Sequence, residues 1–123
     1  MDLGIQGKNA IVCASSRGLG RACAIALARE GVNVTINGRN DEAIQEVVGS
    51  CSKFGVNVQS VIGDITKEST RDSLLVACPA PDILITNNAG PPPGKIADWN
   101  YQAWIGALEA NMITHMLMIR AVL

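Results

Sequence analysis

A short glycine-containing turn near the start of the chain is the first candidate for chemistry. Residues 15–20 read Ser-Ser-Arg-Gly-Leu-Gly and lie between an apolar run and a helical pattern. Gly18 and Gly20 have no Cβ, so a phosphate can come close to the backbone there. A helix amino terminus adds unpaired N–H groups and a partial positive charge. The turn therefore predicts a diphosphate site, with an ordinary tight turn as the alternative. The predicted contacts are Ser15, Ser16, Arg17, Gly18, Leu19 and Gly20.

Two arginines indicate which dinucleotide such a site would prefer. A site that prefers NAD places an acidic residue ~20 residues after the glycine turn, where it binds the ribose 2′-hydroxyl. Here residues 37–40 read Asn-Gly-Arg-Asn, and the first acid, Asp41, is better placed to begin a helix. Arg39, with Arg17 as a second cation, would form charge-assisted hydrogen bonds with a 2′-phosphate. We therefore predict NADP(H) as the cofactor, with Arg39 and Asn40 among its contacts. A solvated arginine at a strand end is the alternative for Arg39.

The elements that must position these residues alternate between two periodicities. Short apolar runs, typical of strands buried on both faces, alternate with segments of helical spacing. The predicted strands are residues 10–14, 32–37, 56–62 and 82–86. The predicted helices are residues 18–30, residues 41–54, a segment that Thr66 can cap and that ends near Ala77, and a long segment from Asp98 or Trp99. This order predicts an α/β fold, a Rossmann-like doubly wound parallel sheet with strand order 3-2-1-4.

The composition argues against several other classes of protein. The chain has 123 residues, which suits one domain, and its formal net charge of −1 gives no electrostatic case for nucleic acid or an anionic membrane. The longest mostly apolar stretch, residues 112–123, contains His115 and Arg120 and falls short of the ~20 apolar residues of a spanning helix. Four separated cysteines and one histidine argue against a metal site. They predict free buried thiols in a reducing cytoplasm.

A second motif, together with the glycine turn, points to a family. Residues 87–90 read Asn-Asn-Ala-Gly and follow Asp-Ile-Leu-Ile at 82–85. The glycine turn is similar to Thr-Gly-x-x-x-Gly-x-Gly, with Cys13 in place of Thr and Ala14 in place of the first Gly. On these motifs the whole chain resembles the amino-terminal half of the short-chain dehydrogenase/reductase family, in its NADP(H)-dependent branch. It looks most like the 3-oxoacyl-acyl-carrier-protein reductases. Because Ala14 adds a Cβ at the tightest point, we expect the turn to be slightly displaced.

The resemblance implies further cofactor contacts. In the family, the segment that matches Asn88, Ala89 and Gly90 passes beside the cofactor ribose. Asp64 matches the aspartate that accepts from the exocyclic amine of adenine, and Ile65 matches its apolar neighbour beside the ring. Considered without the resemblance, Asp64 could instead be a turn residue before the next helix.

The resemblance also implies a reaction, the reduction of a ketone by hydride transfer. The substrate would be a small-molecule or acyl-carrier-bound carbonyl compound, such as a 3-oxoacyl thioester. Asn111 matches the catalytic asparagine that holds a water in a proton relay. Its alternative is a buried asparagine satisfied by backbone in a packed interface.

The family's catalytic Ser, and its Tyr and Lys four residues apart, lie downstream of the position of Asn111. The chain ends at Leu123, before any of them. Its one tyrosine, Tyr101, has Ile105 rather than a lysine four residues later. We therefore expect residues 1–123 to be the amino-terminal part of a longer single-domain enzyme, truncated before strand five and inactive alone. A naturally short, inactive nucleotide-binding or interaction module is the alternative.

The last predicted helix also bears on assembly. In the family, the helix that contains Asn111 helps to form the main subunit interface. Met112, Met116 and Ile119 would suit that role, because uncovered apolar stripes tend to mark contacts. We expect the full-length protein to be a homodimer or homotetramer.

Overall fold

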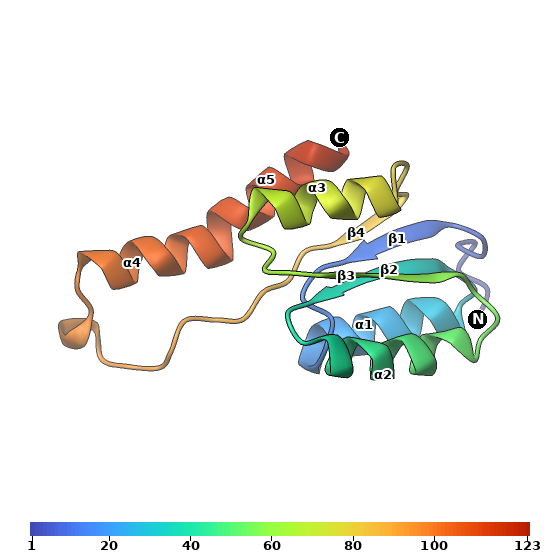
Figure 1. Ribbon diagram of the computed structural model, residues 1–123, viewed down its shortest axis with the longest axis horizontal. Helices are drawn as coiled ribbons and strands as arrows, with labels where there is room; N and C mark the ends of the chain where they lie inside the picture. Colours follow the sequence, from blue (N-terminus) through green and yellow to red (C-terminus); the bar gives the residue numbers. More distant parts are fainter.

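The structure is a computed structural model that describes residues 1–123, and a four-stranded parallel sheet forms its centre (Figure 1). The strands are β1 (Asn9–Val12), β2 (Asn33–Gly38), β3 (Val58–Ile62) and β4 (Ile83–Ile85). Their order in the sheet is β3-β2-β1-β4, and every pairing is parallel. This confirms the predicted Rossmann-like α/β fold and its strand order.

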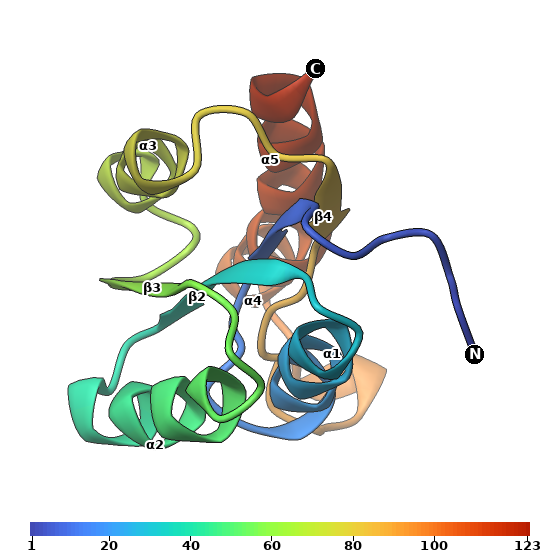
Figure 2. The same ribbon diagram turned by 90° about the vertical axis from the view of Figure 1, so that its right-hand side faces the viewer.

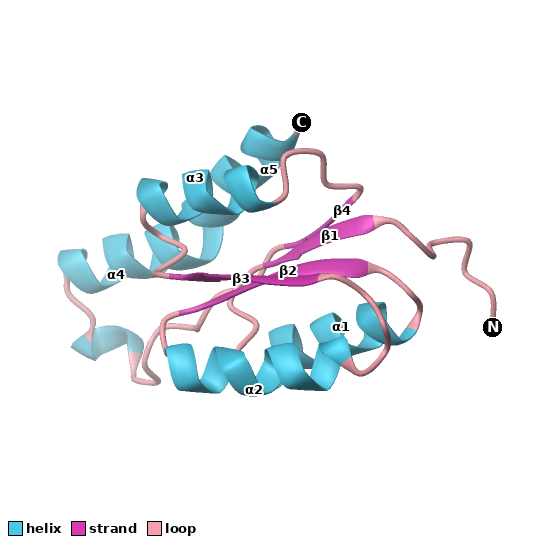
Figure 3. Cartoon of the chain, turned by 45° about the vertical axis from the view of Figure 1, so that its right-hand side comes forward, coloured by secondary structure: helices cyan, strands magenta, loops and turns pink.

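Helices cover both faces of the sheet (Figures 2 and 3). They are α1 (Gly18–Arg29), α2 (Asp41–Ser52), α3 (Glu68–Ala77), α4 (Tyr101–Leu108) and α5 (Thr114–Val122). Helices α1 and α2 lie against one face, and α3 and α5 lie against the other. Strand β1 lies inside the sheet and buries both rows of its side chains, which is why its sequence is continuously apolar, whereas the edge strand β3 includes the exposed residues Gln59 and Ser60.

Strand β1 shows how the two cores form. Side chains alternate between the faces of a strand. Ala10 and Val12 belong to the core beneath α1 and α2, whereas Ile11 and Cys13 belong to the core beneath α3 and α5. The free cysteines are Cys13, Cys51 and Cys78, which are buried, and Cys23, which is half-buried. The predicted free thiols are therefore present, with Cys23 as the least buried.

Two helix starts differ from each other in how they are capped. Asn40 caps α2, because its side-chain oxygen accepts a hydrogen bond of 2.9 Å from the Ala43 N–H. The prediction that Thr66 caps the next helix is wrong, since α3 begins at Glu68 with Lys67 as its uncapped N-cap residue. The Thr66 hydroxyl instead donates to the Asp64 carboxylate at 2.8 Å, which occupies it before the helix begins.

The last helical region is interrupted. A 3-10 turn (Ile96–Asp98) precedes α4, and Asn100 caps α4, so the predicted start at Asp98 or Trp99 lies slightly too early. A π-helical segment (Glu109–Ile113) separates α4 from α5. No helix of the structure has both the length and the apolar content needed to cross a membrane.

Candidate functional site

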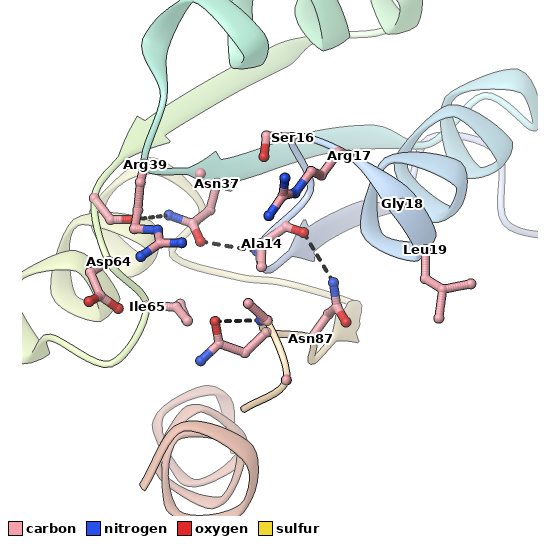
Figure 4. A pocket seen from close by; sticks show the side chains of 15 residues that line it. Ala14, Ser16, Arg17, Gly18, Leu19, Asn37, Arg39, Asp64, Ile65 and Asn87 are labelled. Carbon is pink, nitrogen blue, oxygen red and sulfur yellow. Dashed lines mark hydrogen bonds between the residues drawn. The ribbon is translucent and has the colours of Figure 1, made fainter. Parts of the chain in front are cut away.

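One cavity, with a volume of about 450 Å³, lies where the carboxyl ends of the four strands meet (Figure 4). The segments that follow β1, β2, β3 and β4 all contribute to its lining. The lining residues are Ala14, Ser16, Arg17, Gly18, Leu19, Asn37, Gly38, Arg39, Gly63, Asp64, Ile65, Asn87, Asn88, Ala89 and Gly90. Ligands of open α/β sheets bind at this edge, because the loops that follow parallel strands converge there.

Most of the predicted cofactor contacts line this cavity. From the glycine turn these are Ser16, Arg17, Gly18 and Leu19, and from the later segments they are Arg39, Asp64, Ile65, Asn88, Ala89 and Gly90. The structure therefore brings together residues that four separate sequence motifs supplied.

Three predicted contacts do not line the cavity, and each has a structural task instead. Asn40 caps α2. Ser15 is fully buried, and its hydroxyl donates to the Val12 carbonyl at 2.9 Å and accepts from the Asn37 N–H at 3.0 Å. Gly20 lies within α1, where a Cβ would collide with the Ala14 carbonyl oxygen. Its missing side chain thus allows α1 to pack against the preceding turn.

We call residues 14–20 the phosphate turn. Gly18 has a φ of +59°, and apart from its chain neighbours no heavy atom lies within 4 Å of the position that a Cβ would occupy. Helix α1 then begins with no side-chain cap and no acidic residue in its first turn. The first N–H groups of a helix have no partner within the helix. They are therefore available to an anion, and no carboxylate of that turn opposes it.

Two guanidinium groups and one carboxylate set the electrostatics of the cavity. Figure 4 shows Arg17 near Gly18, and Arg39 beside Asp64. The pKa of the Asp64 carboxyl lies below its ordinary value, mainly because the Thr66 backbone N–H donates to it. Partial burial opposes this shift, and the Thr66 hydroxyl and the charge of Arg39 add to it. Asp64 is therefore ionised at neutral pH.

Asp64 lies in a loop, residues 63–66, that is held from two sides. Both hydrogen bonds from Thr66 go to the Oδ1 atom of Asp64, so the turn role considered from the sequence is present. The Arg71 guanidinium donates to the carbonyls of Ile65 at 3.1 Å and Thr66 at 2.9 Å. Asp64 lines the cavity as well, so its turn role does not remove it from the predicted site.

The sequence reasoning missed five lining residues: Ala14, Asn37, Gly38, Gly63 and Asn87. Ala14 was noted only as a departure from a motif, yet its φ of +46° is the one positive φ among the non-glycine residues. Its carbonyl accepts from the Asn87 side chain at 3.0 Å, and its N–H donates to the Asn37 side chain at 3.1 Å. The available signal was Asn37 itself, a polar residue at the end of an apolar strand.

Asn111 does not line this cavity. It lies in the π-helical segment, is exposed, and donates to the Ala107 carbonyl of its own helix at 3.1 Å. The backbone partner considered in the alternative for Asn111 is therefore present, and the side chain is exposed in the single chain. Asn111 borders a second cavity, of about 380 Å³, together with Trp99 and the prolines at 91–93. The two cavities share Ala89 and Gly90 and are therefore adjacent.

The sequence has relatives among known proteins. The family described as short chain dehydrogenase matches residues 8–123. The protein YtkK of Bacillus subtilis is 36% identical over 126 aligned positions, which cover 94% of this chain and 48% of YtkK. Dehydrogenase/reductase SDR family member 4 of Oryctolagus cuniculus is 31% identical, over 96% of this chain and 47% of that protein. The chain thus spans about half the length of the curated relatives it matches.

Solved structures show the same arrangement. L-sorbose reductase from Gluconobacter frateurii, complexed with NADPH and L-sorbose, superposes with a TM-score of 0.91 at 28% identity, over 99% of this chain and 48% of that one. Glucose dehydrogenase of Caenorhabditis elegans, in its apo form, superposes with a TM-score of 0.82 at 30% identity, over 96% of this chain and 49% of that one.

Proposed function

We propose that this chain, which belongs to the short-chain dehydrogenase family, forms the NADP(H)-binding part of an oxidoreductase that reduces a ketone. The observation that carries the proposal is the cavity at the carboxyl edge of the sheet, which Arg17 and Arg39 line together. NADPH, when bound, supplies the hydride for the carbonyl carbon, and the residues of this chain bind and orient it. The NADPH complex of the similar L-sorbose reductase supports this choice of cofactor.

The phosphate turn fits a dinucleotide. Space is open above Gly18, and the uncapped start of α1 offers N–H donors to a diphosphate. Arg39 and Arg17 would bind a 2′-phosphate, which only NADP(H) carries, and guanidinium groups suit phosphate geometry. Beside them, Ile65 would pack against adenine while Asp64 accepts from its amine.

The other end of the cavity leads to the proposed substrate position. Asn88, Ala89 and Gly90 would contact the ribose next to the nicotinamide, and the second cavity begins at Gly90. Prolines and alanines dominate the lining of the second cavity, which supports an acyl substrate such as a 3-oxoacyl thioester. Asn111, at its border, would hold a water in a proton relay. No side chain of its lining is acidic or basic.

The test is a change of cofactor preference. Replacing Arg39 with Asp removes charge-assisted hydrogen bonds to the 2′-phosphate and places a carboxylate nearby. Such bonds contribute about 1.5–3 kcal/mol, so we expect NADPH to bind roughly 10–100-fold more weakly in Arg39→Asp. Binding of NADH, which lacks the 2′-phosphate, should change little. Fluorescence titration of both nucleotides measures this.

Arg29→Asp is the matched control. The Arg29 guanidinium lies over the Phe54 ring, 5.9 Å from its centroid, and does not line the cavity. This variant should keep the preference for NADPH. Equal affinities of the wild-type protein for NADPH and NADH would refute the assignment of the 2′-phosphate site.

We also propose that the protein forms a homo-oligomer through the outer face of α4 and α5. Met112, in the π-helical segment, and Met116 and Ile119, in α5, are 48%, 60% and 45% exposed. Large exposed apolar side chains grouped in this way are typical of a contact with another protein surface. A second copy of the chain is the proposed occupant.

A further inference from the structure

Asn37 connects the two ends of the cavity. It is the next-to-last residue of β2, lies opposite Val61 of β3, and is 1% exposed. Its Oδ1 atom accepts from the Ala14 N–H at 3.1 Å, on the β1 side. Its Nδ2 atom donates to the carbonyls of Val61 and Gly63, each at 3.1 Å, on the β3 side.

One carboxamide thus bridges the phosphate turn and the 63–66 loop. The Asn37 backbone strengthens the first connection, because its carbonyl accepts from the Ser15 N–H at 2.7 Å and its N–H donates to the Ser15 hydroxyl at 3.0 Å. The connection to the 63–66 loop is strengthened at the adjacent residue of β2, because the Gly63 N–H donates to the Gly38 carbonyl at 2.9 Å. Only an amide supplies an acceptor on one side and two donated hydrogen bonds on the other.

The separation of these two segments matters for a long ligand. Under the proposed function, the phosphate turn would bind the diphosphate, whereas the 63–66 loop and Arg39 would bind the adenosine end. A ligand that engages two fixed subsites gains affinity from both at once, and this gain is lost when the subsites move relative to each other.

We infer that Asn37 is a positioning residue whose side chain holds the phosphate turn and the 63–66 loop at a fixed separation, so that one dinucleotide engages both. This inference rests on the proposed function. It assigns no ligand contact to the Asn37 amide, whose hydrogen bonds all go to the protein backbone.

The experiment compares a whole ligand with its parts, in the protein as its gene encodes it. Affinities are measured for NADPH, for adenosine 2′-monophosphate, which reaches only the loop end, and for inorganic pyrophosphate, which reaches only the turn. In Asn37→Ala we expect NADPH to bind about tenfold more weakly or worse, because three part-buried hydrogen bonds that link the two segments are lost. Each fragment should bind within about threefold of its wild-type affinity. A fragment contacts only one of the two segments, so a change in the distance between the segments does not affect it.

Asn33→Ala is the matched control. Asn33 lies at the other end of β2 and also links three strands, because its side chain donates to the Asn9 side chain at 3.2 Å and accepts from the Asn57 N–H at 3.0 Å. It lies outside the lining of the nucleotide cavity. Asn33→Ala should lower the melting temperature less than Asn37→Ala does, because its hydrogen bonds are exposed, while NADPH binding stays within about twofold of the wild type.

The outcomes separate the two proposals. If the wild-type protein does not bind NADPH, the proposed function fails, and this inference fails with it. If the wild type binds NADPH and folded Asn37→Ala binds it equally well, only the inference is overturned. If one fragment weakens as much as NADPH, Asn37 supports one end alone, which also overturns it. Should Asn37→Ala not fold, Asn37→Ser, whose short hydroxyl cannot span both segments, is judged by the same criteria.

Discussion

Replacing Ala14 with glycine should stabilise the protein. Ala14 has a φ of +46°, in the left-handed region that side chains with a Cβ disfavour. It cannot relax, because the Asn37 side chain holds its N–H and the Asn87 side chain holds its carbonyl. A glycine at this position would adopt the same backbone conformation without the steric cost and keep both hydrogen bonds.

The size of the effect follows from two opposing terms. A residue with a Cβ in the left-handed region costs about 1–2 kcal/mol. Glycine gives the unfolded chain more freedom, which costs about 0.4–1 kcal/mol. The free energy of unfolding of Ala14→Gly should therefore rise by roughly 0.5–1 kcal/mol, which for a domain of this size raises the melting temperature by about 2–5 °C.

The assay is urea unfolding of wild type and variant, with calorimetry for the melting temperatures. Gly55→Ala is the control, because Gly55 has a φ of +78° and open space around the position of a Cβ. This reverse change should lower the free energy of unfolding by roughly 0.5–1 kcal/mol, from the same two terms with opposite sign. If Gly55→Ala is destabilised as expected but Ala14→Gly is no more stable than wild type, the strain assigned to Ala14 is refuted.

Two further predictions concern the core and the outer face. Burial raises the pKa of the Cys13 thiol from 9.0 to about 12, so the neutral thiol is favoured in the folded state. The stability that comes from keeping this thiol neutral is complete below about pH 9 and is lost as the pH rises towards about 12. Between pH 8 and pH 10, the melting temperature of Cys13→Ala should therefore fall less than that of the wild type, as measured by thermal unfolding. Met116→Lys should lower the mass of the particle measured by light scattering without lowering the melting temperature, and an unchanged mass would contradict the proposed interface.

The edge of the sheet at which the site forms was predictable from the sequence. Alternating strands and helices require a parallel sheet, and a parallel sheet brings the segments after its strands to one edge. Arg17, Arg39, Asp64 and Gly90 follow four different strands, and they line the same cavity for this reason. The order of the strands and helices is enough to place these four residues together, without knowledge of any contact between their side chains.

The hydrogen bonds within that edge were not predictable in the same way. Asn37 meets Val61 because of the register between β2 and β3, and a sequence pattern of period two does not fix which residues lie opposite each other. Thr66 shows the same limit, since its hydroxyl could cap a helix or bind a nearby carboxylate, and the turn at Asp64 decides between them. Such choices depend on the partner that the tertiary structure brings closest.

A π-helical segment, Glu109–Ile113, divides the last helical region. A single turn with wider hydrogen bonding shifts every later side chain around the helix axis, so a period of 3.6 drawn through it is wrong on its far side. Thr114 and Met118 are the buried residues of α5, whereas Met112 and Met116, which the sequence predicts to be uncovered, are exposed. The same segment reaches the site, because the Asn88 side chain donates to the Ala110 carbonyl at 3.0 Å. Asn88 lines the first cavity and Ala110 the second, so this hydrogen bond links the linings of the two cavities.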